Sequence, residues 1–519
     1  MGLLKSTAIV SSMTMLSRVL GLARDMVFTR IFGAGAGTDA FLIAFKIPNF
    51  LRRLFAEGAF SQAFVPVLTE YKTKRSHDEV ADLASRTAGT LGGILFLVST
   101  ISVIAAPLLV MVFAPGFIGN ETKFDLTTQM LRITFPYLLF ISLTALMAGI
   151  LNSYGKFAIP AFTPVFLNII LILAAIYLAP HLSDPITALA WGVFFAGIVQ
   201  LGFQLPYVAK LGLLRLPRWG FRHEGVRRIM KLMIPGIIGS SMMQINLLLD
   251  TLIASFLVTG SVTWLYLSDR MMELPLGVFG IALATVILPG LSEQHAKADP
   301  KAFSHMIDWA LRWVLVIGTP AAVALAVLAA PILSTLFLHG KFQAHDVLMA
   351  QMSLIAYSFG ILGFILVKVL APGYFARQDT KTPVRIAMIA MAVNMVCNIA
   401  FVVPMVMLDM EGPHTGLALA TTVSAFVNAG LLLRGLRKSG VYSPDAGWLK
   451  FGAKVILANV VMLVVLWFIS GETSLWLAIG TWERIARLSG VVVAGAGVYF
   501  GTMWLFGVRL TDLMHRPST

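Results

Sequence analysis

Long apolar stretches constrain this chain more than any other feature of its sequence. About fourteen mostly apolar runs follow one another, each long enough to cross a bilayer as a helix of ~20 residues. Only 12% of the residues are charged, about half the share in a soluble domain. The runs are too long for transmembrane strands and lack their two-residue alternation. The sequence therefore predicts an all-α polytopic membrane protein.

Pro and Gly residues separate the expected membrane spans. We place the spans at residues 6–32, 40–68, 87–113, 129–152, 159–179, 186–207, 231–258, 262–292, 310–338, 347–372, 383–408, 415–436, 449–470 and 485–508. Loops on one side of this bundle hold most of the 39 Lys and Arg residues, whereas the opposite loops hold four. Basic loops stay in the cytoplasm, so we expect both termini there.

Two parts of the chain repeat each other about 223–225 residues apart, as related transporter lobes do. The matched residues are Asp25, Gly35 and Thr38 with Asp250, Gly260 and Thr263, and Pro66 to Glu70 with Pro289 to Glu293. We expect an N lobe (residues 1–207) and a C lobe (residues 208–436) of six helices each, related by a pseudo-two-fold axis along the membrane normal. Residues 437–519 add a hairpin of two further helices.

Charged residues inside the spans are the strongest functional signal, because each costs about 2.5–3.5 kcal/mol at mid-bilayer. In the second span, polar residues fall within about 80° of helical arc, and Pro48 can bring Arg52 close to them. These residues are Asp39, Lys46, Asn49, Arg53 and Glu57. The first span adds Arg18, Arg24 and Asp25, and the eighth adds Asp269, Arg270 and Glu273.

Arginine predominates among these buried cations, and its planar guanidinium binds phosphate or carboxylate through two hydrogen bonds. The pattern predicts a wet cavity between the lobes that binds an anion such as a phosphate or diphosphate. An alternative is a set of ion pairs at helix ends that neutralise one another, as Arg270 and Glu273 can do at a spacing of three residues.

Five motifs resemble the MurJ (MviN) family, which belongs to the superfamily of the multidrug MATE exporters. They are Ser11 to Asp25 (SSMTMLSRVLGLARD), Thr38 to Phe41 (TDAF), Pro48 to Pro66 (PNFLRRLFAEGAFSQAFVP), Asp269 to Pro275 (DRMMELP) and Val369 to Pro383 (VLAPGYFARQDTKTP). The resemblance implies a lipid II flippase of peptidoglycan synthesis, in the bacterial cytoplasmic membrane. The implied substrate is undecaprenyl diphosphate carrying the disaccharide-pentapeptide, moved to the periplasmic leaflet by alternating access.

The resemblance also assigns site residues. The family's essential arginines match Arg18, Arg24, Arg52 and Arg270, and its important acid matches Asp39. Asn49, Arg53, Asp269 and Glu273 match further cavity positions. The family's groove for the lipid tail is attributed to the last two helices; ordinary close packing of the small residues near Gly497 is the alternative there.

A cation site is a further expectation. Asp250, Asn394, Asn398 and Thr421 offer oxygen ligands of the kind that hard cations prefer, and some family members hold Na⁺ on the same three helices. The alternative is a buried hydrogen-bonded cluster in which Asp250 is protonated. No other cofactor is expected.

Three other functions fit parts of the pattern. A flippase for a different polyprenyl-diphosphate glycan would need the same basic cavity. A membrane enzyme would need an acidic metal-binding pair in a sizeable loop, and the long loops here are basic, so we expect no catalytic activity. A scaffold for cell-wall or division proteins would tolerate loss of the arginines. We expect the membrane, lipid II and such proteins as partners, and no nucleic acid.

Overall fold

The computed structural model describes residues 3–53 and 60–508, and all regular secondary structure within these ranges is helical. The predicted all-α class is confirmed. The residues form two compact units, Met1–Gly260 and Ser261–Thr519. The first unit thus includes α11 (Glu224–Ser255), which packs against α3 (Ser61–Lys74), α4 (His77–Ile104) and α5 (Ala106–Phe113). The lobe boundary that the sequence repeat places at residues 207 and 208 stays a prediction.

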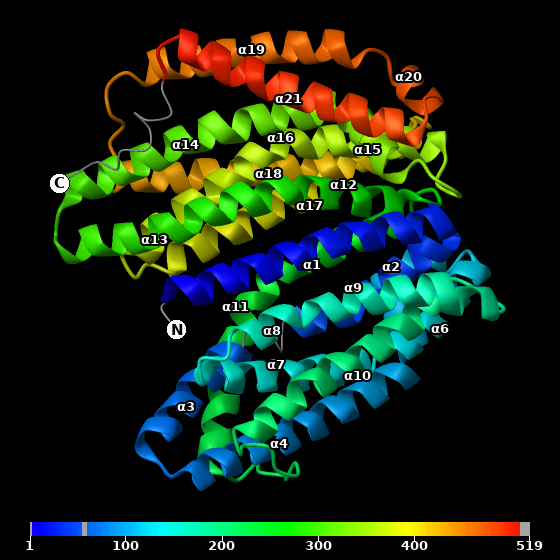
Figure 1. Ribbon diagram of the computed structural model, residues 1–519, viewed down its shortest axis with the longest axis vertical. Helices are drawn as coiled ribbons and strands as arrows, with labels where there is room; N and C mark the ends of the chain where they lie inside the picture. Colours follow the sequence, from blue (N-terminus) through cyan, green and yellow to red (C-terminus); the bar gives the residue numbers. More distant parts are fainter. Residues whose placement is uncertain (1–2, 54–59, 509–519) are drawn as a thin grey trace. The chain divides into compact units, whose positions relative to one another are not determined.

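Within its described residues the first unit has eleven α-helices, several of which lie side by side (Figure 1). They are α1 (Leu3–Phe32), α2 (Ala36–Arg52), α3 (Ser61–Lys74), α4 (His77–Ile104), α5 (Ala106–Phe113), α6 (Glu121–Thr134), α7 (Tyr137–Ser153), α8 (Ala158–Phe162), α9 (Pro164–Leu173), α10 (Thr187–Lys210) and α11 (Glu224–Ser255). Within the unit, α7 packs against both α4 and α10, while α1 packs against α8 and α9.

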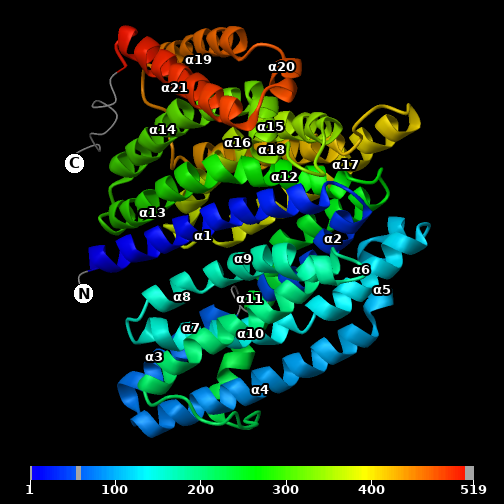
Figure 2. The same cartoon turned by 45° about the vertical axis from the view of Figure 1, so that its right-hand side comes forward.

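The second unit contains α12 to α21, and its last helices form a hairpin (Figure 2). The helices are α12 (Ser261–Pro275), α13 (Ile281–Ala296), α14 (Pro300–Val327), α15 (Ala329–Phe337), α16 (Ala344–Phe375), α17 (Lys381–Met407), α18 (Thr415–Lys438), α19 (Trp448–Ser470), α20 (Thr473–Ala478) and α21 (Thr481–Leu505). Helix α16 packs against α12, α14 and α18, and α19 packs against α14 and α21.

Ten helical segments in the described residues are long and apolar enough to cross a membrane. They correspond to ten of the expected spans. The four others are the first, second, seventh and eighth, which are the spans that carry Arg24, Asp39, Asp250 and Arg270. Of these, α2 has 17 residues and α12 has 15, so both are short for a span. The total of fourteen spans stays a prediction.

Several expected boundaries are wrong for identifiable reasons. Helix α4 begins at His77 rather than at residue 87, because Ser76 and Glu79 form a capping box that starts the helix in the polar segment. The expected fourth span is divided between α6 and α7 at Pro136, and the eighth is divided by a π-helical turn over residues 276–280 that follows Pro275.

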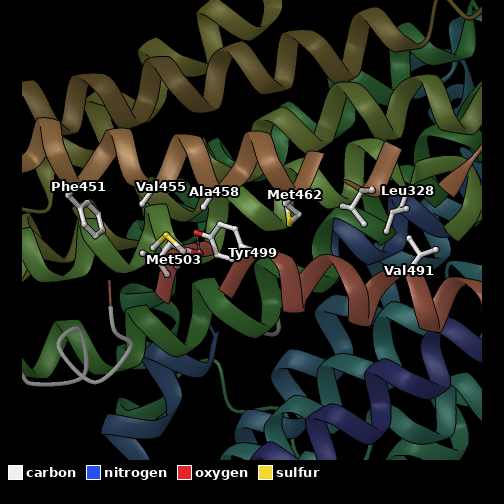
Figure 3. Close-up of a cluster of buried hydrophobic side chains, with 10 residues drawn as sticks. Leu328, Phe451, Val455, Ala458, Met462, Val491, Tyr499 and Met503 are labelled. Atoms are coloured by element: carbon white, nitrogen blue, oxygen red, sulfur yellow. Dashed lines mark hydrogen bonds between the residues drawn. The ribbon is translucent and has the colours of Figure 1, made fainter. Parts of the chain in front are cut away.

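The α19–α21 hairpin packs on α14 through a buried apolar cluster (Figure 3). Val455, Ala458 and Met462 of α19 lie in this cluster with Tyr499 and Met503 of α21. The Tyr499 hydroxyl also donates a hydrogen bond to the Val316 carbonyl oxygen at 2.9 Å. These contacts make the hairpin part of the second unit rather than an isolated appendage.

A buried carboxylate fastens the start of this hairpin to α14. Asp308 accepts hydrogen bonds from the Tyr442 hydroxyl at 2.9 Å and from the Trp448 indole, and Arg312 Nε lies 2.8 Å from the carboxylate. Burial, and then the bond to Asp308, raise the pKa of Tyr442. The carboxylate therefore joins α14 to the segment that leads into α19.

Replacing Asp308 with alanine should lower the free energy of unfolding by about 3 kcal/mol, because it leaves Arg312 and the donors of Tyr442 and Trp448 without their acceptor. The loss should appear as a lower midpoint of thermal unfolding in detergent or vesicles. Asp184→Ala removes an exposed aspartate and is the matched control, for which we expect no shift. Equal midpoints for the two variants would show that Asp308 does not hold the hairpin.

Candidate functional site

The first unit buries a charged group in the middle of α1. Arg24 is 8% exposed and Asp25 is 1% exposed. The Nε and Nη2 atoms of Arg24 both donate to Asp25 Oδ1, at 2.9 and 2.6 Å. Its Nη1 atom donates to Asn168 Oδ1 on α9 at 3.2 Å. The guanidinium is therefore held in one orientation, and Arg18 lies partly buried two turns earlier on the same helix.

Asp39 lies buried in the first turn of α2 and binds two groups from other segments. Its carboxylate accepts a hydrogen bond from the Gly260 amide at 2.7 Å, and Lys123 Nζ lies 3.9 Å from it. Lys123 is 5% exposed. Gly260 has a φ of +99°, in a region that favours glycine, and immediately precedes α12. Asp39 thus fixes the chain at the end of the first unit.

The second half of α2 carries the other predicted site residues. Helix α2 continues through Pro48 to Arg52, so the expected break in register at Pro48 is not seen. Arg52 Nε donates to Asn49 Oδ1 at 2.8 Å across one turn of the helix. Lys46 is partly buried and Arg53 is exposed. Glu57 lies outside the described residues.

In the second unit, α12 carries three site residues close to Pro275. Arg270 Nη1 lies 3.5 Å from Glu273 Oε2, which confirms that the two can pair, and the guanidinium also lies over the Tyr266 ring. Asp269 is partly buried, while the Glu273 side chain is 48% exposed. Since the pair is partly open to solvent, it contributes little stability and Arg270 can exchange it for another anion.

The charge of α1 and α2 is predominantly positive. Helices α1 and α2 contain six Lys or Arg residues but only two acidic residues, Asp25 and Asp39. Both carboxylates have a buried cationic partner, Arg24 and Lys123 respectively. Basic residues therefore outnumber acidic ones on these two helices, and this excess of positive charge favours an anionic ligand.

The predicted cation ligands fall in both units. Asn394 and Asn398 of α17 are fully buried, and Asn398 Nδ2 donates to Asn394 Oδ1 at 3.1 Å. Asn394 Nδ2 donates to Thr421 Oγ1 of α18 at 3.3 Å. These three side chains therefore form one cluster whose oxygen atoms suit a hard cation. Asp250 belongs to α11 in the first unit and is partly buried.

Two functional partners were not predicted from the sequence. Asn168 is the only polar residue of α9, and an amide in an apolar membrane helix was a signal that could have singled it out. Lys123 falls in the expected loop between the spans at residues 87–113 and 129–152, and it is one of the four basic residues in the loops on that side. Both partners contact residues that are distant in sequence, which a reading of single helices does not reveal.

Comparisons with known protein sequences all match this chain to the same family. A family model described as lipid II flippase MurJ matches residues 28–485. The chain is 49% identical to a probable lipid II flippase MurJ of Vibrio cholerae, over 98% of this chain and 97% of that protein. It is 42% identical to the lipid II flippase MurJ of Burkholderia cenocepacia, over the full length of both.

Solved structures agree with the sequence comparisons. A lipid II flippase MurJ in an inward closed conformation matches with a TM-score of 0.79 and 26% identity, over 98% of this chain and 100% of that one. An inward-facing multidrug transporter of the MATE family matches with a TM-score of 0.64, over 84% of this chain and 98% of that one. Its identity of 14% makes this second match evidence for the fold alone.

Proposed function

Because this multi-pass membrane chain belongs to the MurJ family of lipid II flippases, we propose that it carries lipid II from the cytoplasmic to the periplasmic leaflet of the bacterial inner membrane. The excess of arginine and lysine on α1 and α2 is the observation that supports an anionic, diphosphate-bearing cargo. The family is one of transporters rather than of enzymes, and the proposal includes no catalytic step.

The arginines bind the diphosphate in this proposal. Arg24, Arg52 and Arg270 supply guanidinium groups, each of which can donate two parallel hydrogen bonds to phosphate oxygens. Their present partners are side chains, and a diphosphate offers stronger, doubly charged acceptors. Transport proceeds by alternating access, with binding shifting the population between inward-open and outward-open states.

The polyprenyl tail stays in the lipid beside the α19–α21 hairpin. One face of α21 supports this placement, because Gly490, Gly497 and Gly501 have no atom within 4 Å of the position of an added Cβ. Gly495 instead packs closely against Leu466 of α19. The helix thus has one face for close packing and another of small residues along which an isoprenoid chain can lie.

We also propose that Na⁺ is a coupling ion, held by Asp250, Asn394, Asn398 and Thr421. The oxygen-rich cluster on α17 and α18 supports this assignment. A cation bound there would balance part of the charge that moves with the substrate. Both chain termini lie in the cytoplasm in this proposal, and the partners include proteins of cell-wall synthesis and division.

Replacing Asp250 with asparagine should remove the dependence of transport on Na⁺, because an amide cannot neutralise the cation as a carboxylate does. Initial rates of lipid II translocation in vesicles, measured over a series of Na⁺ concentrations at constant ionic strength, test this. Asp184→Asn, an exposed change of the same kind, serves as the control. An unchanged Na⁺ dependence in Asp250→Asn would remove Asp250 from the site.

A complementation experiment tests the proposed function as a whole. Cells depleted of their own lipid II flippase and supplied with this chain should expose lipid II on the outer leaflet and continue to grow. If lipid II stays on the inner leaflet although the chain is present in the membrane at normal amounts, the proposed cargo is wrong.

A further inference from the structure

Asn168 occupies an unusual position for an amide. Helix α9 has the sequence PVFLNIILIL, and Asn168 is its only polar residue. The side chain is 6% exposed, so it is buried in protein and does not face lipid. A buried amide is destabilising unless both its oxygen and its nitrogen are hydrogen-bonded. Its oxygen and nitrogen atoms must therefore find hydrogen-bond partners within the first unit.

Both ends of the amide bind α1. The Oδ1 atom accepts a hydrogen bond from Arg24 Nη1 at 3.2 Å, and Nδ2 donates one to the Ser17 carbonyl oxygen at 3.0 Å. Ser17 and Arg24 are seven residues apart, which places them two turns apart on the same face of α1. Helical side chains point toward the N-terminus of their helix, so the Arg24 guanidinium extends back toward the turn that Asn168 binds.

The absence of charge on Asn168 is as important as the geometry of its hydrogen bond to Arg24. Asp25 already provides one carboxylate to Arg24, through Nε and Nη2. A second carboxylate at position 168 would give the group a net negative charge, whereas an amide accepts the Nη1 hydrogen bond and adds no charge. The neutral residue therefore fixes the guanidinium without giving the Arg24–Asp25 group a net negative charge that would repel an anion.

We propose that Asn168 is a positioning residue for Arg24, which sets the direction of the guanidinium for binding the diphosphate of the cargo without adding a second carboxylate beside Asp25. This inference rests on the proposed function. It adds a residue on α9 to a site that is otherwise assigned to α1, α2 and α12. It also accounts for a polar residue that packing alone does not require.

Asn168→Asp and Asn168→Leu test this role in purified protein, with the affinity for lipid II and its translocation rate in proteoliposomes as readouts. At neutral pH we expect Asn168→Asp to lower the affinity at least about tenfold, because the added carboxylate competes with the diphosphate for Arg24. Asn168→Leu removes the bond but adds no charge, so its loss should be smaller. Asn152→Asp makes the same change at an exposed position and should match the wild type.

The pH profile separates positioning from a merely structural role. A protonated aspartic acid resembles asparagine, since it can accept from Arg24 and donate to the Ser17 carbonyl oxygen. The affinity of Asn168→Asp should therefore recover as the pH is lowered, while that of Asn168→Leu should not. Thermal unfolding midpoints show whether each variant is folded, and Asn168→Leu keeps the test valid if the aspartate variant does not fold.

The outcomes distinguish a failure of the positioning role of Asn168 from a failure of the proposed diphosphate site at Arg24. If Arg24→Ala loses binding but both Asn168 variants bind lipid II as the wild type does, the positioning role is wrong and the proposed function stands. If Arg24→Ala itself binds normally, the proposed diphosphate site is wrong. A pH-independent loss that is equal in Asn168→Asp and Asn168→Leu would also contradict positioning, because it would indicate a packing defect.

Discussion

Arg24→Ala should reduce lipid II translocation at least about 100-fold, because a charge-assisted, doubly hydrogen-bonded contact to the diphosphate contributes about 3 kcal/mol. The same change leaves the Asp25 carboxylate, which is 1% exposed, without its cation. An uncompensated buried charge is strongly destabilising. Loss of transport in this variant would therefore have two possible causes, and translocation must be measured together with the thermal unfolding midpoint.

A double variant separates these causes. In Arg24→Ala/Asp25→Ala the unpaired carboxylate is gone, so we expect the unfolding midpoint to recover toward that of the wild type. Translocation should stay as low as in the single variant, because the guanidinium is still missing. Restored transport in the double variant would mean that Arg24 serves only to neutralise Asp25, and the anion-binding role would be wrong.

Asp39→Ala should have a comparably large effect on folding and transport. The change removes the acceptor of the Gly260 amide and leaves Lys123 as a buried cation with no carboxylate at 3.9 Å. Breaking a buried ion pair costs about 3–5 kcal/mol. We expect a clear fall in the unfolding midpoint and loss of translocation, since Asp39 holds the end of the first unit at Gly260.

Two further variants show which contact matters. Asp39→Asn keeps an acceptor for the Gly260 amide but loses the negative charge. Asp39→Ala/Lys123→Met removes the buried cation but does not restore an acceptor for the Gly260 amide. If the hydrogen bond to Gly260 is the functional contact, Asp39→Asn should retain more transport than the double variant. The reverse order would indicate that the charge of Asp39 is what transport requires.

Most of the fold could be predicted because lipid imposes a simple rule on sequence. A segment that crosses the hydrocarbon core must be apolar and helical, and ten such segments stand out. Boundaries were predicted less well. The start of α4 depends on a capping box within a polar segment, and the division at Pro275 depends on whether the helix bends or ends there. The position of an apolar run shows neither where a capping box starts a helix nor whether a helix bends or ends at a proline.

The candidate site could be predicted in part for the same reason. Charges such as Arg24 and Asp39 are conspicuous in a membrane span, and the pairing of Arg270 with Glu273 follows from their spacing on one helix. Partners on other helices could not be predicted. Asn168 is 144 residues from Arg24, and Gly260 is 221 residues from Asp39, so only the packing of the first unit shows that they meet.

The rate at which lipid II reaches the outer leaflet of proteoliposomes that contain only this protein tests the central claim most directly. Wild-type protein should raise this rate in proportion to its amount. A variant with glutamine at Arg24, Arg52 and Arg270 should return the rate to that of protein-free vesicles. A wild-type rate no higher than in empty vesicles, or an unchanged rate in the folded triple variant, would contradict the claim that these arginines carry an anionic lipid across the membrane.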